Sequence, residues 1–185
     1  MAETTDSQTQ SDPKAQVWLK PEQIEAMRDA TVSNSADYLS ARNDAVIALL
    51  ADTGLRVGEL VQLNVEHFDP DEGILRLPAD LQKDYPNDNS PDYVEIELDS
   101  ETVRTLQQYL NTRWKDTEAL FPSRQSDRMT QQSVRNVVAN AAENADIAPY
   151  SVKGRGKASH ITPHTLRHSV AYRMLNKEQG NTLYD

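Results

Sequence analysis

The sequence predicts an α+β fold that is mostly helical, with one small three-stranded antiparallel sheet. Two patterns predict it. Apolar residues recur at helical spacing, most clearly at Ala45, Val46, Leu49 and Leu50. In contrast, residues 93–98 alternate apolar and acidic side chains, which is typical of a strand with one face in water. The length of 185 residues is enough for one domain with a real core.

Three helices are expected in the first third of the chain. The first opens at residues 18–21, where Pro21 suits the first turn because its missing N–H costs nothing there. The second covers about 40–53 and ends at Gly54, a residue suited to a C-terminal cap. The third is short and covers 57–63.

The pattern then changes to strands. Residues 65–68 and 74–77 flank a turn-rich Asp-Pro-Asp-Glu-Gly segment at 69–73, which is typical of a hairpin. The third strand, 93–98, follows a polar loop over 79–91. Three further helices are expected after the sheet, at 100–113, 130–144 and 162–176. Residues 149–160 lie between the last two, and the basic stretch 153–157 within them is interpreted as a flexible loop.

Composition narrows the class of protein. Residues 1–16 contain only a few small apolar side chains and are expected to form a disordered tail, so the domain is placed at 17–185. Cysteine is absent, which excludes disulfides and thiolate chemistry. No apolar run approaches the roughly 20 residues of a membrane span, and no signal peptide is recognisable. A cytoplasmic protein is expected.

The charge distribution is uneven. The net charge is −10, yet residues 147–177 contain six basic residues and no acidic one, whereas 64–102 contain twelve acidic and two basic residues. A positive segment therefore interrupts a negative protein, as a nucleic-acid contact would require. The acidic excess, with twelve Arg against seven Lys, is typical of a halophilic source such as a haloarchaeon. The alternative is an ordinary acidic protein of a mesophile.

The first candidate motif is H-T-L-R-H at 164–168. His164, Arg167 and His168 share one helix face because they are spaced by three and four residues. The preceding Thr162 and Pro163 are suited to a helix start, where free N–H groups and the helix dipole favour an anion. Cations placed there indicate a bound phosphate. The alternative is a solvated polar helix start.

The second motif is T-G-L-R-V-G-E-L at 53–60. Arg56 begins a helix, and Glu59 can orient it through a charge-assisted hydrogen bond. Considered alone, the pair is equally consistent with an ordinary surface ion pair.

Taken together, and in this order around a hairpin and a loop lysine, the two motifs resemble the catalytic domain of the tyrosine recombinases, the phage-integrase and Xer-like enzymes. The resemblance covers about Trp18 to Asp185. It implies the fold of the DNA breaking-rejoining enzymes, with Arg56 and Arg167 as the two catalytic arginines that grip the scissile phosphate. It also implies a supporting role for Glu59, acid–base or phosphate-holding work for His164, and a supporting role for His168. Lys83 would be the lysine that protonates the departing 5′ oxygen, although its acidic surroundings depart from the family pattern.

The same resemblance implies two further features, a second His or Trp motif and a tyrosine nucleophile, that are not found after Arg167. No second His or Trp motif follows Arg167. The family places its tyrosine nucleophile more than eighteen residues after the second arginine, whereas this sequence ends eighteen residues after Arg167. Tyr184 is therefore not expected to be the nucleophile, and Tyr172 is expected to pack in the core or a groove. The sequence is interpreted as a catalytic domain truncated before its nucleophile.

Two other patterns favour a metal or nucleotide site only weakly. Histidines at 160, 164 and 168 have a spacing that can bind zinc, but no nearby carboxylate completes a site, so no metal is expected. The G-R-G-K segment at 154–157 lacks the spacing of a phosphate-binding P-loop, and no nucleotide cofactor is expected. It is interpreted as a backbone contact for DNA, with a solvated loop as the alternative. The expected DNA-binding residues are Lys153, Arg155, Lys157 and Arg173.

The leading hypothesis is a site-specific DNA recombinase or integrase domain that binds duplex DNA, alone or with other protomers. It is expected to position a scissile phosphate without a cofactor. One alternative is a non-catalytic, regulatory DNA-binding derivative. Another is an enzyme completed by a partner's tyrosine.

Overall fold

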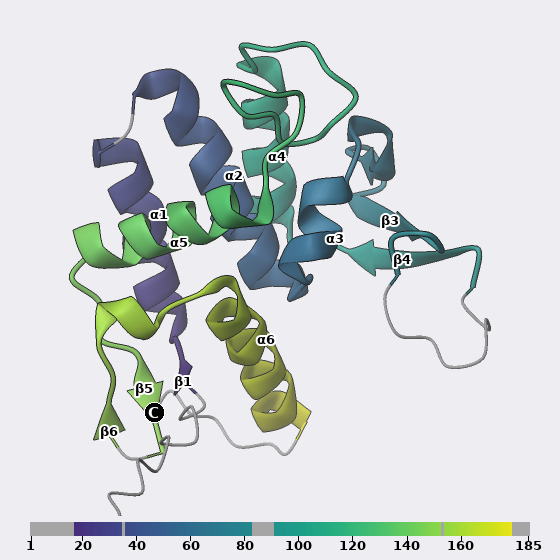
Figure 1. Ribbon diagram of the computed structural model, residues 1–185. Helices are drawn as coiled ribbons and strands as arrows, with labels where there is room; N and C mark the ends of the chain where they lie inside the picture. Colours follow the sequence, from purple (N-terminus) through teal and green to yellow (C-terminus); the bar gives the residue numbers. More distant parts are fainter. Residues whose placement is uncertain (1–16, 35, 83–90, 153, 179–185) are drawn as a thin grey trace, which may run out of the picture.

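The computed structural model describes residues 17–34, 36–82, 91–152 and 154–178 (Figure 1). Two small sheets and a set of helices alternate along the chain. In order, the elements are β1 (Val17–Trp18), α1 (Pro21–Asn34), α2 (Asp37–Thr53), α3 (Val57–Gln62), the 3₁₀ turn η1 (Val65–His67), β2 (Phe68–Asp69), β3 (Ile74–Pro78), β4 (Tyr93–Glu97), α4 (Ser100–Asn111), α5 (Gln131–Asn144), β5 (Tyr150–Ser151), β6 (Gly154–Arg155), the 3₁₀ turn η3 (Ala158–His160) and α6 (Pro163–Glu178).

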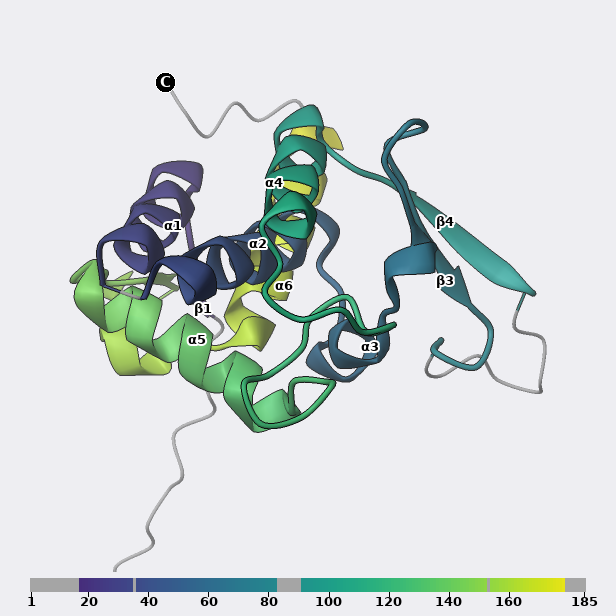
Figure 2. The ribbon, with the colours of Figure 1, turned by 90° about the horizontal axis from the view of Figure 1, so that it is seen from above.

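Helix α2 is the centre of the core. All seven residues from Ala45 to Ala51 are buried, so this part of the helix is apolar on every side. A helix of that kind requires neighbours all round. It has them in α1, α4 and α6, which pack against it in Figures 1 and 2. The predicted helix at 40–53 is thus confirmed, and it begins three residues earlier than expected, at Asp37.

The predicted antiparallel sheet is present as β2–β3–β4 and extends to one side of the helices (Figure 1). Gly73 closes the predicted hairpin with a left-handed φ of 68°, and Phe68 pairs with Leu75. The first strand was wrongly placed, because residues 65–67 form the turn η1 instead. The Val65 amide there donates to the Glu118 carbonyl at 2.8 Å, which takes this backbone out of the β2–β3 ladder.

A second sheet, β1–β5–β6, was not predicted. Trp18 lies in β1 and pairs with Tyr150, so the expectation that a helix opens at this residue was wrong, and α1 begins at Pro21. Within the stretch 153–157 that was interpreted as a flexible loop, Gly154 and Arg155 instead form β6, which pairs with β5 in a short hairpin. Local patterns could not reveal this sheet, because β1 hydrogen-bonds to a segment far along the chain.

Helix α6 is held between α2 and β1. On the β1 side, the buried Ser169 hydroxyl accepts the Leu19 amide at 2.8 Å and donates to the Thr165 carbonyl at 2.8 Å. On the α2 side, Val170 is buried against Gly54. These contacts fix the position of the helix that carries the H-T-L-R-H motif. Within the described part of the chain, no helix has the combined length and apolar character that crossing a bilayer requires.

Candidate functional site

Arg56 is positioned by the start of α3. It is the N-cap residue of that helix, with extended backbone angles, and its own N–H donates to Glu59 Oε2 at 2.8 Å. Its guanidinium Nη1 donates to the other carboxylate oxygen, Oε1, at 3.1 Å. The Glu59 side chain is 8% exposed whereas that of Arg56 is 40% exposed. A buried carboxylate therefore orients a guanidinium that remains open to solvent, as the sequence predicted for this pair.

The turn between α2 and α3 is shaped by Thr53 and Gly54. Gly54 ends α2 with a left-handed φ of 65°, which glycine adopts at little cost. The Thr53 hydroxyl donates to the Leu49 carbonyl at 2.6 Å and accepts the Leu55 amide at 3.2 Å. The chain consequently leaves α2 in one defined direction, and Arg56 follows two residues after the glycine.

Arg167 reaches the same turn from α6. Its guanidinium Nη1 donates to the carbonyl oxygen of Gly54. Arg167 thus bonds the turn that leads into Arg56, although 111 positions separate the two arginines in the sequence. The role of the Gly54 carbonyl as the acceptor that holds Arg167 was missed, since no sequence signal distinguishes a backbone acceptor.

The two histidines of the motif lie at the start of α6. The His164 and His168 rings meet edge to face with their centroids 4.2 Å apart. Pro163 is the first residue of the helix, and the Thr162 amide donates to the Thr165 hydroxyl at 3.0 Å. His164 is exposed and His168 half-buried. Two imidazoles and Arg167 thus occupy a helix start, where the dipole favours an anion.

The remaining predicted residues lie elsewhere. Lys83, Lys153 and Tyr184 lie outside the described residues. Arg155 is on β6, and Lys157 is exposed just after it. Neither has a recorded contact with the arginine pair.

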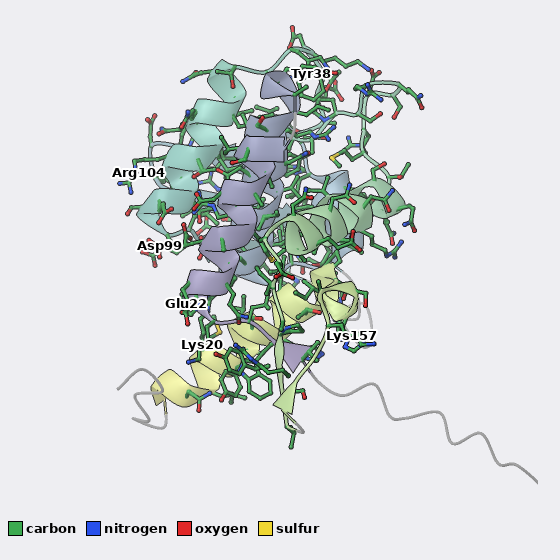
Figure 3. The ribbon with its side chains drawn as sticks, turned by 90° about the vertical axis from the view of Figure 1, so that its left-hand side faces the viewer. Lys20, Glu22, Tyr38, Asp99, Arg104 and Lys157 are labelled. Atoms are coloured by element: carbon green, nitrogen blue, oxygen red, sulfur yellow. The ribbon has the colours of Figure 1, made fainter. Side chains whose placement is uncertain are left out.

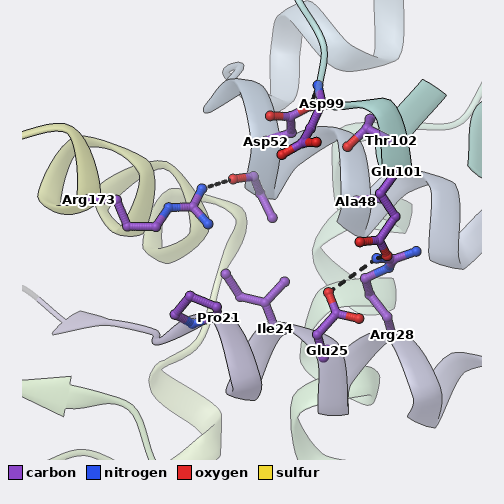
Figure 4. A pocket seen from close by; sticks show the side chains of 11 residues that line it. Pro21, Ile24, Glu25, Arg28, Ala48, Asp52, Asp99, Glu101, Thr102 and Arg173 are labelled. Carbon is purple, nitrogen blue, oxygen red and sulfur yellow. Dashed lines mark hydrogen bonds and ion pairs between the residues drawn. The ribbon is translucent and has the colours of Figure 1, made fainter. Parts of the chain in front are cut away.

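Arg173 occupies a different environment. It donates a hydrogen bond to the Ala51 carbonyl, at the last turn of α2. Figure 4 shows it beside a cavity of about 170 Å³ that Asp52, Asp99 and Glu101 also line. This acidic setting suits a structural role better than the predicted contact with DNA.

The geometry is suited to binding a tetrahedral oxyanion. Two guanidinium groups at one turn offer several N–H donors, and planar guanidinium forks match phosphate oxygens. Among the described residues, no group of three or more His, Asp or Glu side chains is arranged to hold a metal ion.

Comparison with known proteins shows which family has this fold and these two arginine motifs. The Phage integrase family matches residues 17–181, so the chain belongs to that family. Among curated proteins it is similar to the tyrosine recombinase XerD of Vibrio vulnificus, with 29% identity over 161 residues, 85% of this chain and 47% of the relative. It is also similar to XerC of Neisseria meningitidis, with 31% identity over 166 residues, 88% of this chain and 47% of the relative. The chain spans about half the length of these relatives.

Solved structures confirm the expected fold class. The crystal structure of XerA recombinase superposes with a TM-score of 0.67 at 25% identity, covering 87% of this chain and 51% of XerA. The Tn1549 transposon integrase in complex with transposon right end DNA gives a TM-score of 0.67 at 19% identity, covering 91% of this chain and 55% of the integrase. The chain therefore has the tyrosine-recombinase fold.

Proposed function

We propose that this chain is the phosphate-binding part of a site-specific DNA recombinase, which binds duplex DNA and positions a scissile phosphate for cleavage and rejoining. The observation that carries the proposal is the hydrogen bond from Arg167 to the carbonyl of Gly54, two residues before Arg56. Membership of the Phage integrase family supports it. So do the DNA complexes of proteins with the same fold, such as XerH bound to its difH substrate.

In the proposed reaction a tyrosine hydroxyl attacks the phosphorus. A phosphotyrosyl bond forms to the 3′ end, the bond to the 5′ oxygen breaks, and that oxygen leaves with a proton. A 5′ hydroxyl then attacks in turn and releases the tyrosine. Arg56 and Arg167 neutralise charge on the non-bridging oxygens of the pentavalent transition state. His164 and His168 add donors at the helix start, and Lys83 is proposed as the acid that protonates the 5′ oxygen.

We assign the nucleophile to a tyrosine outside the described residues or to one supplied by a second protomer. Two of the described tyrosines, Tyr109 and Tyr172, are engaged in packing. Tyr109 is buried with its hydroxyl bonded to the Leu120 carbonyl at 2.9 Å, and burial raises its pKa well above the usual range. Tyr172 stacks on Trp18, in line with the expected packing role. This observation also keeps a second function open, that of a non-catalytic DNA-binding derivative.

Replacing Arg56 and Arg167 together by Ala should weaken duplex binding by about 100-fold or more. Charge-assisted hydrogen bonds contribute roughly 1.5–3 kcal/mol each, and about 1.4 kcal/mol corresponds to a tenfold change in affinity. The measurement is fluorescence anisotropy of a labelled duplex in low and in molar KCl. A nicked suicide duplex, run on a denaturing gel, reports any covalent adduct.

The matched control is Arg104→Ala/Arg135→Ala, which removes the same charge from two exposed positions on α4 and α5. It should bind nearly as the wild type does. Equal losses in the two double variants would show that only net charge matters and would refute the proposed site. With binding present, an adduct favours a recombinase with its own tyrosine, and no adduct favours the non-catalytic or partner-completed form.

A further inference from the structure

Two cations face the ring of Tyr150. The guanidinium carbon of Arg155, on β6, lies 3.9 Å from the ring centroid. The Nζ of Lys20, from the segment between β1 and α1, lies 5.0 Å from the same centroid. Cation–π attraction therefore gathers two positive charges from distant parts of the chain at one aromatic side chain.

Tyr150 belongs to a row of aromatic rings that runs to α6. Trp18 stacks against Tyr150 at 6.3 Å and against Tyr172 at 4.6 Å, between centroids. We refer to Tyr150, Trp18 and Tyr172 as the aromatic row. Tyr172 lies four residues after His168 on α6, so the two share a side of that helix. The row thus connects the cation pair to the helix face that bears the histidines.

Backbone contacts hold this arrangement in place. Trp18 pairs with Tyr150 across β1 and β5, and Tyr150 pairs with Arg155 across β5 and β6. Arg155 Nη1 also donates to the Ala148 carbonyl at 3.2 Å. Arg155 is consequently presented by a small sheet, and Lys20 follows two residues after strand β1 of that sheet.

The cations near Tyr150 lack the acidic partners that other basic residues of this protein have. Among the described residues, no carboxylate forms an ion pair with Lys20, Arg155 or Lys157, whereas Arg28 and Arg76 each contact three. Figure 3 shows Lys20 and Lys157 toward the end of the molecule that holds the β5–β6 hairpin, away from Arg104 on α4. In a protein with a net charge of −10, cations left without carboxylates at one end indicate an anionic partner.

We propose that Lys20 and Arg155, oriented by Tyr150, bind backbone phosphates of the duplex beside the scissile phosphate, and that Tyr150 is a positioning residue for both. The inference rests on the proposed function and extends its DNA contact to Lys20, which the sequence did not single out. The row from Tyr150 ends at Tyr172 on α6, the helix that also carries Arg167.

Lys20→Gln and Arg155→Gln should each weaken duplex binding by about three- to tenfold. Each should also reduce the slope of log affinity against log salt by about one, because a protein with one phosphate contact fewer releases fewer counterions on binding.

Tyr150→Phe keeps the ring and should bind as the wild type does. Tyr150→Leu removes the ring and should bind less tightly. The measurement is anisotropy of one labelled duplex over a KCl series, with thermal melts to show that each variant is folded.

Arg104→Gln is the matched control and should leave affinity and slope unchanged, since this exposed residue lies on α4. Wild-type affinity and slope in both Lys20→Gln and Arg155→Gln would overturn the inference. If Arg56→Ala/Arg167→Ala still weakened binding in that case, the proposed function would stand. A wild-type protein that bound no duplex at any salt concentration would overturn both. The Lys20 and Arg155 variants make the test independent of whether Tyr150→Leu folds.

Discussion

Replacing Glu59 with Ala should lower the free energy of unfolding by about 1–3 kcal/mol, because two hydrogen bonds lose their acceptor in a buried setting. The carboxylate accepts both the backbone N–H and the guanidinium of Arg56, and its side chain is 8% exposed. The same change should weaken duplex binding, because it leaves the half-exposed guanidinium of Arg56 without its carboxylate. Urea unfolding and duplex anisotropy measure the two effects.

One further variant at Glu59 and one control at Glu97 test whether the charge of the Glu59 carboxylate and its place beside Arg56 matter. Glu59→Gln keeps an oxygen that can accept the Arg56 amide, so it should recover part of the stability while binding stays reduced. Glu97→Ala removes an exposed carboxylate from β4 and should change neither quantity strongly. The account of Arg56 would be wrong if Glu59→Ala unfolded and bound DNA as the wild type does.

Gly54→Ala should destabilise the protein by about 1–2 kcal/mol, the cost of a left-handed conformation for a residue with a Cβ. The φ of Gly54 is 65°, and a Cβ there would lie 3.4 Å from the Cβ of Val170 on α6. Because the Gly54 carbonyl also holds Arg167, a shift of this turn should reduce duplex affinity as well. Thermal melts and anisotropy report the two changes.

Gly58→Ala is the matched control for this substitution. Gly58 lies within α3, and the nearest atom to an added Cβ is the end of the flexible Gln131 side chain at 3.4 Å. Alanine in a helix interior is favoured over glycine by roughly 0.5–1 kcal/mol, so this variant should be as stable as the wild type or more stable. Equal destabilisation by both substitutions would argue against a special role for the Gly54 turn.

The helices and the β2–β3–β4 sheet could be predicted because their signals are local. Periodic apolar residues marked α2, and alternation marked β4. The pairing of Arg56 with Glu59 followed from a spacing of three on one helix start. That Arg167 acts together with Arg56 could be predicted only from the family resemblance, since no local sequence pattern relates the two residues.

The remaining features depend on contacts between distant segments. Strand β1 is two residues long and exists through its pairing with β5, so Trp18 carried no signal of its own. Lys20 is equally unremarkable in the sequence, and only the fold places it over Tyr150. DNA binding by Arg173 stays a prediction from the charge of its segment. Charge counts could not show that this side chain bonds the Ala51 carbonyl of α2.

Arg56 and Arg167 are proposed to bind one phosphate, and a double-mutant cycle tests this most directly. Duplex dissociation constants would be measured for the wild type, Arg56→Ala, Arg167→Ala and the double variant under one salt condition. Groups acting on one phosphate should be coupled by about 0.5–3 kcal/mol, so the double variant should lose less affinity than the two single losses combined. Losses that add to within about 0.5 kcal/mol would show two independent contacts and contradict the claim.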